Sequence, residues 1–416
     1  MTAPAVSVIV VSRNRPDRLA LCLKGLGQLD YPSFEIVVVA DRRGLRVVDT
    51  LPDFFGRVKS VAFDEPNISA ARNAGLAAAA GEIVAYIDDD AVPEPLWLRH
   101  LVTGFADPRV AAATGYVIGP SGVAFQHRIR AVTERAREYA LPMEGLRTKV
   151  LQLGSGEAVK TEGTNMAFRR DVLAGLGGFD AAYRFYLEEA DVNLRLSDAG
   201  HATAVVPLAQ VHHGVAPSPR RRDDRVATDL HDVGASLAVF LRKHSSHPDI
   251  STPARAERQR RWRALVAHMV AGRIEPRDVR RTLKTFDAGW SEGHERAHSE
   301  TAAIGPPSAP FLPFRPRVAR SGHVVIGGRA WQAAGRLEAA RRLVERGATV
   351  TVVLLSPTAR PHRARFDGAG YWVQRGGLFG PAGPDEPRVR GWRFRDRIGQ
   401  ETARVAPVRG APMDRR

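Results

Sequence analysis

Continuous apolar runs alternate with helical patterns through the first part of the chain. The runs VSVIVV at 6–11, FEIVVVA at 34–40 and VKSVAF at 58–63 are short and rich in β-branched side chains, which predicts strands buried on both faces. Between the first two, leucines recur at helical spacing after Pro16, a favoured first helical residue, with Asp17 in the first turn. This strand, helix and strand form a βαβ unit, which predicts a parallel sheet.

An alanine-rich segment and a further apolar run come next. NISAARNAGLAAAAG, at 67–81, starts with a capping residue, Asn67 or Ser69, and ends at Gly81, so we expect a helix packed tightly on the sheet. Strand 83–87 then runs directly into Asp88, Asp89 and Asp90. Prolines at 93 and 95 stop its continuation.

The three consecutive carboxylates predict a cation site. Ligands bind at the carboxyl ends of the strands of an open α/β sheet, and three adjacent negative charges there repel one another. A divalent cation with oxygen ligands, which keeps substrate phosphates as its remaining ligands, would compensate them. The alternative is an acidic turn lying in water.

Helical and strand patterns continue after the three aspartates, with a less regular stretch at 121–160. We expect helices near 95–105, 129–140 and 185–200, and strands at 110–120 and 201–214. The segment 217–225 is basic and contains proline, so it predicts a linker or an exposed arm. Helical patterns follow at 229–244, 260–273 and 276–286, and 323–355 predicts one further βαβ unit, expected to dock on the main body or on another chain.

These patterns predict five parts, with the clearest boundary in the proline-rich stretch. They are an α/β domain at 1–216, a helical extension at 217–304, a proline-rich linker at 305–317, a small βαβ unit at 318–383 and a poorly ordered arginine-rich tail at 384–416.

Composition narrows the functional classes. The 416 residues are 44% hydrophobic and 25% charged, and the only cysteine is Cys22, so the chain is globular with neither a disulfide framework nor a thiolate zinc site. There is no apolar stretch long enough to span a membrane and no signal pattern, which predicts a cytoplasmic protein, with peripheral contact at the inner face of the membrane left open.

Charge adds little. The net charge of +16 attracts polyanions such as nucleotides, nucleic acid or anionic lipid, although an arginine-rich coding bias gives the same excess. Aromatic residues are sparse among the basic runs, so we do not expect nucleic-acid binding. The first strand–helix turn also lacks a G-x-G-x-x-G fingerprint, which counts against an oxidoreductase.

Four segments, in order, resemble the family-2 inverting glycosyltransferases of the GT-A fold. They are VSVIVVSRNRPDRL with EIVVVAD, NISAARNAGLAAAAGEIVAYIDDD, GTNMAFRR, and FYLEEADVNLRL followed by two histidines, and together they cover about residues 5–215. The resemblance implies an α/β GT-A fold with a Rossmann-like mixed sheet, here extended by helices and a small βαβ unit. It also implies a role in polysaccharide biosynthesis.

The resemblance also assigns the donor side. Asp88 and Asp90 of the DxD motif would hold Mg²⁺ or Mn²⁺, with His212 or His213 as a further ligand, and Asp89 would lie nearest the donor ribose or sugar. Donor nucleotide binding would use Asp41, Arg72, Asp88 and Asp89, with a UDP, GDP or dTDP sugar as donor. Relatives often have two acids where this chain has Ala40 and Asp41, so the preferred base stays open.

On the acceptor side, the resemblance implies that the motif E-[DE]-x-D supplies a catalytic base. An acceptor hydroxyl needs a carboxylate to take its proton. We expect Glu189 in this role, with Glu188 as its competitor and Asp191 in support. Two acids at a helix start are also explained by the helix dipole alone. Gly163, Thr164 and Asn165 would contact the acceptor or the sugar.

The sequence thus predicts a metal-dependent, inverting transferase that moves a sugar to a hydroxyl of a glycan, a lipid-linked sugar or a similar acceptor. A nucleotidyltransferase is one alternative, but SRNRPDR lacks the glycines of its basic loop. A non-catalytic nucleotide- or glycan-binding protein on the same scaffold is the other.

Overall fold

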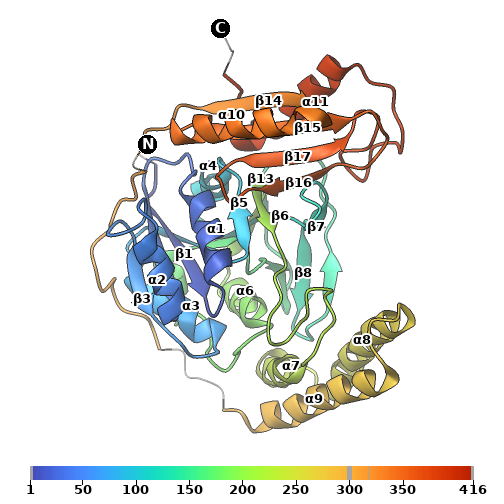
Figure 1. Ribbon diagram of the computed structural model, residues 1–416. Helices are drawn as coiled ribbons and strands as arrows, with labels where there is room; N and C mark the ends of the chain where they lie inside the picture. The colour runs from blue at the N-terminus through green and yellow to red at the C-terminus, as the bar shows by residue number, and fades with distance from the viewer. Residues whose placement is uncertain (1–2, 298–301, 317, 414–416) are drawn as a thin grey trace.

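The computed structural model describes residues 3–297, 302–316 and 318–413. The main body is a ten-stranded mixed sheet with the order β10-β13-β6-β12-β4-β1-β2-β3, in which β5 and β7 pair with β13 and β6. A smaller C-terminal unit lies at one end of this body, and three long helices lie at the other (Figure 1).

The first half is the predicted parallel unit. Its elements are β1 (Val6–Ser12), α1 (Pro16–Leu26), β2 (Phe34–Ala40), α2 (Arg42–Thr50), β3 (Lys59–Ala62), α3 (Ile68–Ala78) and β4 (Ile83–Asp88). β1 pairs in parallel with both β2 and β4, so β4 and its carboxylates lie near the middle of the sheet. Asn67 caps α3 by accepting a hydrogen bond from the backbone N–H of Ala70, as expected.

Neighbouring residues of a strand point to opposite faces of the sheet, and helices cover both faces. Val8 and Val10 pack under α1 and α4, whereas Ile9 packs under α3 and α6. The predicted continuous apolar strands therefore correspond to two separate hydrophobic layers.

The second half adds antiparallel strands. It contains β5 (Ala91–Pro93), α4 (Trp97–Leu101), η1 (Val102–Ala106), β6 (Val110–Ile118), β7 (Phe125–His127), β10 (Lys149–Leu151), β12 (Met166–Arg169), α5 (Arg170–Gly175), α6 (Glu188–Asp198) and β13 (Ala202–His213). β12 runs antiparallel between β4 and β6, which makes the sheet mixed.

The helix predicted at 129–140 is wrong. The segment forms β8 (Arg130–Thr133) and β9 (Glu138–Ala140), which make a three-stranded sheet with β11 (Glu157–Lys160). The chain turns between them at Ala136, with φ of 57°. Arg130 donates hydrogen bonds to Glu138 on the neighbouring strand and to Glu162, so ion pairs between strands outweigh the helical propensity of this charged stretch.

Helices α7 (His231–His244), α8 (Ser251–Val270) and α9 (Pro276–Glu295) follow. Glycines let α7 and α9 approach closely, because a side chain at Gly289 would meet the carbonyl oxygen of His231 at 1.9 Å. Leu237 and Phe240 of α7 share a core with Leu187, directly before α6. The helical extension therefore supports the start of α6.

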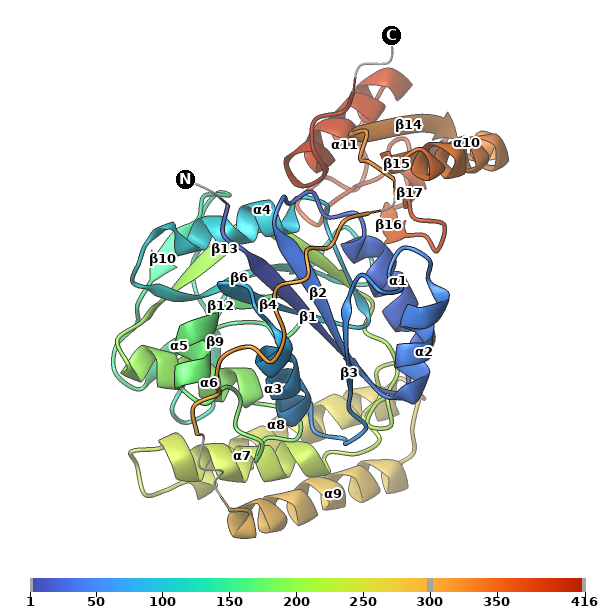
Figure 2. The same cartoon turned by 90° about the vertical axis from the view of Figure 1, so that its left-hand side faces the viewer.

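The proline-rich segment connects α9 to the C-terminal unit, but it is packed on the body (Figure 2). Its backbone N–H groups at Leu312 and Phe314 donate to Glu35 Oε2 and to the carbonyl of Phe34. Phe314 is only 5% exposed and stacks on Phe54 with 5.3 Å between ring centroids. Arg317, at the end of the predicted linker, lies outside the described residues.

The C-terminal unit contains the expected βαβ and more. It comprises β14 (His323–Arg329), η2 (Ala330–Gln332), α10 (Ala333–Glu345), β15 (Thr349–Ser356), β16 (Arg363–Phe366), β17 (Trp372–Gly377) and α11 (Phe394–Arg409). It docks on the main body, one of the two expected outcomes: Lys24 of α1 donates to the carbonyl of Gly368.

The prediction of a poorly ordered tail from residue 384 is wrong where the chain forms α11. Arg397 is fully buried and donates to the carbonyl of Gly380, and Glu401 lies 3.1 Å from it. Two arginines of this segment, Arg397 and Arg409, thus serve as buried ion-pair partners, although an arginine-rich composition resembles that of an exposed tail. Residues 414–416 lie outside the described part. None of the described helices has the length and apolar character required to cross a bilayer.

Replacing Phe314 with alanine should lower the free energy of unfolding by about 3–5 kcal/mol, because it empties a packed aromatic site. Urea denaturation measures the change. Phe55→Ala is the control: Phe55 is 64% exposed, and its loss should change stability by less than about 0.5 kcal/mol. If Phe314→Ala changes the free energy of unfolding as little as Phe55→Ala does, the segment is a free linker.

Candidate functional site

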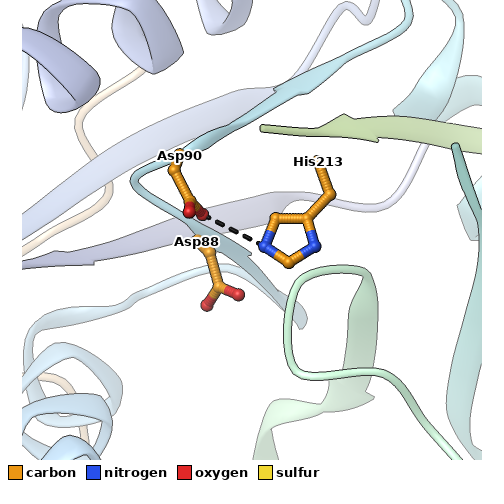
Figure 3. Close-up of side chains that lie close together, drawn as sticks. All are labelled: Asp88, Asp90 and His213. Carbon is orange, nitrogen blue, oxygen red and sulfur yellow. Dashed lines mark ion pairs between the residues drawn. The ribbon is translucent and has the colours of Figure 1, made fainter. Parts of the chain in front are cut away.

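The acidic end of β4 forms a compact cluster with one histidine. Ligand atoms of Asp88, Asp90 and His213 all lie within 4.8 Å of one another, and Nε2 of His213 is 3.3 Å from Oδ1 of Asp90 (Figure 3). β4 and β13 are far apart in the sequence. The predicted pair of aspartates is therefore joined by a ligand from the last strand of the main body.

Local backbone contacts hold His213 in place. β13 pairs antiparallel with β5, so His213 lies opposite Ala91, directly after Asp90. The chain then turns through Val215, whose φ of 52° is rare for a β-branched residue and shows a tightly constrained turn. After it, the N–H of Ala216 donates to Oδ2 of Asp90 at 2.7 Å.

His212 does not join the cluster, so the structure does not support its predicted role as a metal ligand. Its Nε2 lies 2.8 Å from Oε1 of Glu94, and its ring lies 4.5 Å from that of Trp372. Neighbouring residues of a strand face opposite sides, so only one histidine of the pair can reach the aspartates.

The three aspartates differ in their surroundings. Burial raises the pKa of Asp88, and the charge of Asp90 adds to this, while Arg72 opposes it. Burial also raises the pKa of Asp89, to about 6, although Arg15 at 3.1 Å and the Ser12 hydroxyl at 2.8 Å stabilise its charge. For Asp90, burial is outweighed by His213 and by backbone hydrogen bonding, so its pKa falls to about 2.

The cluster fits a divalent cation. Two carboxylates and one imidazole provide oxygen and nitrogen donors, a set that suits Mn²⁺ or Mg²⁺. Asp88 and Asp90 carry like charges close together, and a cation between them would remove their repulsion.

The predicted catalytic glutamates belong to the same site. Arg72 is 3% exposed, and its Nη1 donates to Oε1 of Glu188 at 2.9 Å. Its Nη2 lies 3.7 Å from Oδ1 of Asp88. One buried guanidinium thus contacts both the acidic end of β4 and the start of α6.

Two strained residues lead into α6. Tyr186 and Leu187 have φ values of 75° and 67°, in the left-handed region that non-glycine residues avoid. Burial, with the neighbouring charge of Glu189, raises the pKa of Glu188 to about 7, and its Oε2 has no hydrogen-bond partner among the described residues. Backbone strain like that at Tyr186 and Leu187 is typical of functional sites.

Glu189 has a different environment. Nζ of Lys160, on β11, donates to its Oε1 at 2.8 Å. Burial favours the protonated acid, but the charge of Lys160 outweighs burial and lowers the pKa of Glu189. Glu189 is therefore ionised at neutral pH.

Two further predicted acids make contacts within the fold. Asp41 accepts hydrogen bonds from the N–H groups of Gly44 and Asn14, so it caps α2 and shapes the β1–α1 turn. Asp191 is fully buried and contacts Arg195, Lys243 and His244, so it fastens α6 to α7. Nucleotide binding by Asp41 and catalytic support by Asp191 remain predictions.

The predicted acceptor triplet divides into two parts. The carbonyl oxygen of Gly163 accepts from Nη2 of Arg72 at 3.5 Å, and Oγ1 of Thr164 is buried without a hydrogen-bond partner in the described part of the chain. Asn165 instead accepts from the Trp97 indole and donates to two backbone carbonyls. Because these bonds engage its buried amide, its position does not support a role in acceptor binding.

Sequence reasoning missed Lys160 and Arg15. Lys160 comes from the irregular stretch before β12, where no periodicity marks it. Arg15 lies in the β1–α1 turn and pairs with Asp89. Each of these basic residues is identified only by its contact, in the folded structure, with an acid that the sequence predicts to be functional.

A large pocket adjoins the glutamates. Its volume is 990 Å³, and it lies between the β8–β9 hairpin and α8. Its lining includes Arg130, Glu138, Tyr139, Tyr186, Ala256 and Arg260. Tyr186 is two residues from Glu188, and Glu138 lies 3.8 Å from Lys160, so the pocket wall lies next to the glutamate site without including the glutamates themselves.

Comparison with known proteins identifies the part of the chain that carries the three aspartates, Arg72 and Lys160. The family described as Glycosyl transferase family 2 matches residues 7–177. This part of the chain is therefore a glycosyltransferase family 2 domain, and with the mixed sheet described above the predicted GT-A fold is confirmed.

Curated relatives share this region. They include the probable glycosyltransferase YdaM of Bacillus subtilis, 26% identical over 50% of both chains. The pre-mycofactocin glycosyltransferase of Mycobacterium tuberculosis is 28% identical over 60% of this chain and 49% of its own length. The glucosyl-dolichyl phosphate glucuronosyltransferase of Haloferax volcanii is 29% identical over 42% of this chain and 56% of its own. The chain spans about half the length of these relatives.

Among solved structures, the mannosyltransferase PcManGT of Pyrobaculum calidifontis, in complex with GDP-Man and Mn²⁺, aligns with a TM-score of 0.41. Its identity is 17%, covering 71% of this chain and 88% of that one. GalNAc-T7 with UDP, GalNAc and Mn²⁺ aligns with a TM-score of 0.40 and 18% identity, covering 50% and 44%.

The raised pKa of Glu188 predicts a pH-dependent stability. Folding raises this pKa from 4.5 to about 7, so the proton stabilises the folded state below about pH 4.5, and this contribution is lost as the pH rises towards 7. Relative to Glu188→Gln, the metal-free wild type should lose on the order of 2 kcal/mol between pH 5 and 8.

Urea denaturation across this pH range measures the difference. Asp198→Asn, at the exposed end of the same helix, is the control and should follow the wild type. Parallel pH curves for wild type and Glu188→Gln would refute the raised pKa.

Proposed function

We propose that this chain is a metal-dependent, inverting glycosyltransferase that moves a sugar from a nucleotide-diphosphate donor to an acceptor hydroxyl. The observation that supports it most is the position of Arg72, which contacts Asp88 at 3.7 Å and Glu188 at 2.9 Å. This guanidinium links the candidate cation site to Glu188, the residue next to the candidate base Glu189.

On the donor side, Asp88, Asp90 and His213 would hold Mn²⁺ or Mg²⁺. When bound there, the cation neutralises the negative charge that grows on the departing diphosphate. Arg15 lies near Asp89 and Asp90, and Arg72 lies near Asp88, so both provide positive charge for the phosphates. A UDP, GDP or dTDP sugar fits this arrangement, with Asp41 and Asp89 nearest the nucleoside.

On the acceptor side, Glu189 is the proposed base. The acceptor oxygen forms a bond to the anomeric carbon as the bond from that carbon to the diphosphate breaks, and the hydroxyl proton passes to Glu189. Lys160 keeps Glu189 ionised before the reaction. A single displacement of this kind inverts the anomeric configuration. Glu188, with a pKa of about 7, is the competing base.

The 990 Å³ pocket is the proposed acceptor side. It lies next to the glutamates through Tyr186 and Glu138, and its lining combines carboxylates, arginines and tyrosines with apolar residues such as Leu237 and Pro253. This chemistry suits the hydroxyl groups and apolar ring faces of a glycan or of a lipid-linked sugar, as in polysaccharide biosynthesis.

A donor screen tests the proposal. We expect one of the UDP, GDP or dTDP sugars to raise the melting temperature only in the presence of Mn²⁺, and to be hydrolysed slowly without an acceptor. Stabilisation without turnover would instead indicate a non-catalytic binding protein. Release of pyrophosphate from a nucleoside triphosphate and a sugar phosphate would indicate a nucleotidyltransferase.

Glu189→Gln should leave Mn²⁺-dependent donor binding unchanged and lower transfer by about 100-fold or more, because the base is lost. Calorimetry and product analysis measure the two properties separately. Asp198→Asn, on the same helix, serves as the control. Retained transfer in Glu189→Gln, with loss in Glu188→Gln, would reassign the base to Glu188.

A bulky side chain in the pocket should block the acceptor alone. Ala256→Trp is expected to lower kcat/KM for p-nitrophenyl glycosides of glucose, mannose or galactose by about tenfold or more, through steric exclusion. Donor hydrolysis should not change. Ala264→Trp, also exposed on α8 but outside the pocket lining, should behave as wild type. If both variants transfer equally well, the acceptor binds elsewhere.

A further inference from the structure

The C-terminal unit reaches the back of the two-stranded ribbon that carries two of the candidate cation ligands. Asp90 directly precedes β5, and His213 ends β13. The two strands pair antiparallel, with His213 opposite Ala91 and His212 opposite Val92. His213 contacts Asp90 on one side of this ribbon, whereas His212 contacts Trp372 of the C-terminal unit on the other.

A buried ion pair joins the unit to this ribbon. Glu94 follows β5, and Arg409 at the end of α11 donates from Nε to Oε2 at 2.7 Å and from Nη2 to Oε1 at 2.8 Å. Nε2 of His212 lies 2.8 Å from the same Oε1. The side chains of Arg409 and Glu94 are 4% and 2% exposed, so neither charge is solvated by water. A single carboxylate thus links both strands of the ribbon to α11.

Arg409 is itself held by the strands of the C-terminal unit. Its Nη1 donates to Oγ1 of Thr351, on β15, at 2.9 Å. Its guanidinium carbon lies 4.2 Å from the ring centroid of Trp372, on β17. The backbone next to it is also fixed, because the N–H of Leu96 donates to the carbonyl of Val408. The arginine therefore provides a rigid anchor for the ribbon.

We propose that Arg409 is a positioning residue of the cation site, and that it fixes the spacing of Asp90 and His213 through Glu94 and His212. This inference rests on the proposed cation site. Backbone pairing sets the register of the ribbon, and because β5 has only three paired positions there, the buried contacts of Glu94 and His212 add to what holds it in place. Without the guanidinium, the buried Glu94 charge has lost its partner and moves towards water, which displaces β5 and the adjoining Asp90.

The test compares Mn²⁺ binding by the full-length wild type and Arg409→Met, measured by electron paramagnetic resonance of free Mn²⁺. Outer contacts that orient metal ligands affect affinity strongly, so we expect the dissociation constant to rise by about tenfold or more. Hydrogen–deuterium exchange should also become faster at 90–96 and 208–216. If Arg409 only docks the C-terminal unit, Arg409→Met should change neither the Mn²⁺ dissociation constant nor the exchange at 90–96 and 208–216 more than other substitutions at this interface do.

Arg320→Met is the matched control. Arg320 is another arginine at this interface, and it donates to the carbonyl of Gly27 and to Thr349 Oγ1, away from the ribbon. Its replacement should lower the melting temperature and leave Mn²⁺ affinity unchanged. Arg409→Lys retains the charge but not the paired hydrogen bonds, so it should restore part of the lost affinity.

Wild-type Mn²⁺ affinity in Arg409→Met overturns the proposal, as does an equal loss in Arg320→Met. If Arg409→Met does not fold, Glu94→Gln replaces it: this neutral amide of the same size should weaken Mn²⁺ binding several-fold, and unchanged affinity overturns the proposal. A wild type that binds no Mn²⁺ overturns the cation site as well, so the two failures are distinguishable.

Discussion

The crowding of carboxylates at one buried place is the constraint on which the rest of the site depends. Asp88, Asp89, Asp90, Glu188 and Glu189 converge there, and each loses hydration that its charge requires. Arg15, Arg72 and Lys160 supply three full positive charges. His213 adds a fourth only when it is protonated. Glu188, whose pKa is raised to about 7, carries only part of its charge, but Asp88 and Asp90 remain like-charged neighbours, and a divalent cation would relieve their repulsion.

The basic side chains that contact these acids come from parts of the chain that are distant in sequence. Arg72 lies on α3, Lys160 on β11 and His213 at the end of β13. The strained turn at Tyr186 packs against α8, where Arg261 lies 5.2 Å from its ring. The family 2 match ends at residue 177, so the later segments contribute the glutamates, one candidate ligand and much of the pocket. The matched domain alone would contain an incomplete site.

The parallel α/β unit and the aspartate triplet could be predicted because both are local signals, whereas the GT-A fold and the role of the glutamates followed from the family resemblance. Apolar runs predict buried strands, and consecutive acids at a strand end identify the carboxyl edge of the sheet. Sequence could not choose between His212 and His213, since that depends on which of them faces the side of the sheet where Asp90 lies. It also failed at 129–140, where pairing of Arg130 with Glu138 and Glu162 outweighs helical propensity. Arg397 and Arg409 are buried by partners elsewhere in the chain, which composition does not show.

The two glutamates illustrate how environment separates neighbouring groups of the same chemistry. Burial dominates at Glu188, whereas Lys160 dominates at Glu189, so their pKa values move in opposite directions. A carboxylate held by a dedicated cation would be a poor base, because proton transfer would leave that cation unpaired. Lys160, however, also lies 3.7 Å from Glu162 and 3.8 Å from Glu138. Its charge remains compensated by these two acids when Glu189 takes up a proton, so the network can keep Glu189 ionised and still allow it to act as a base.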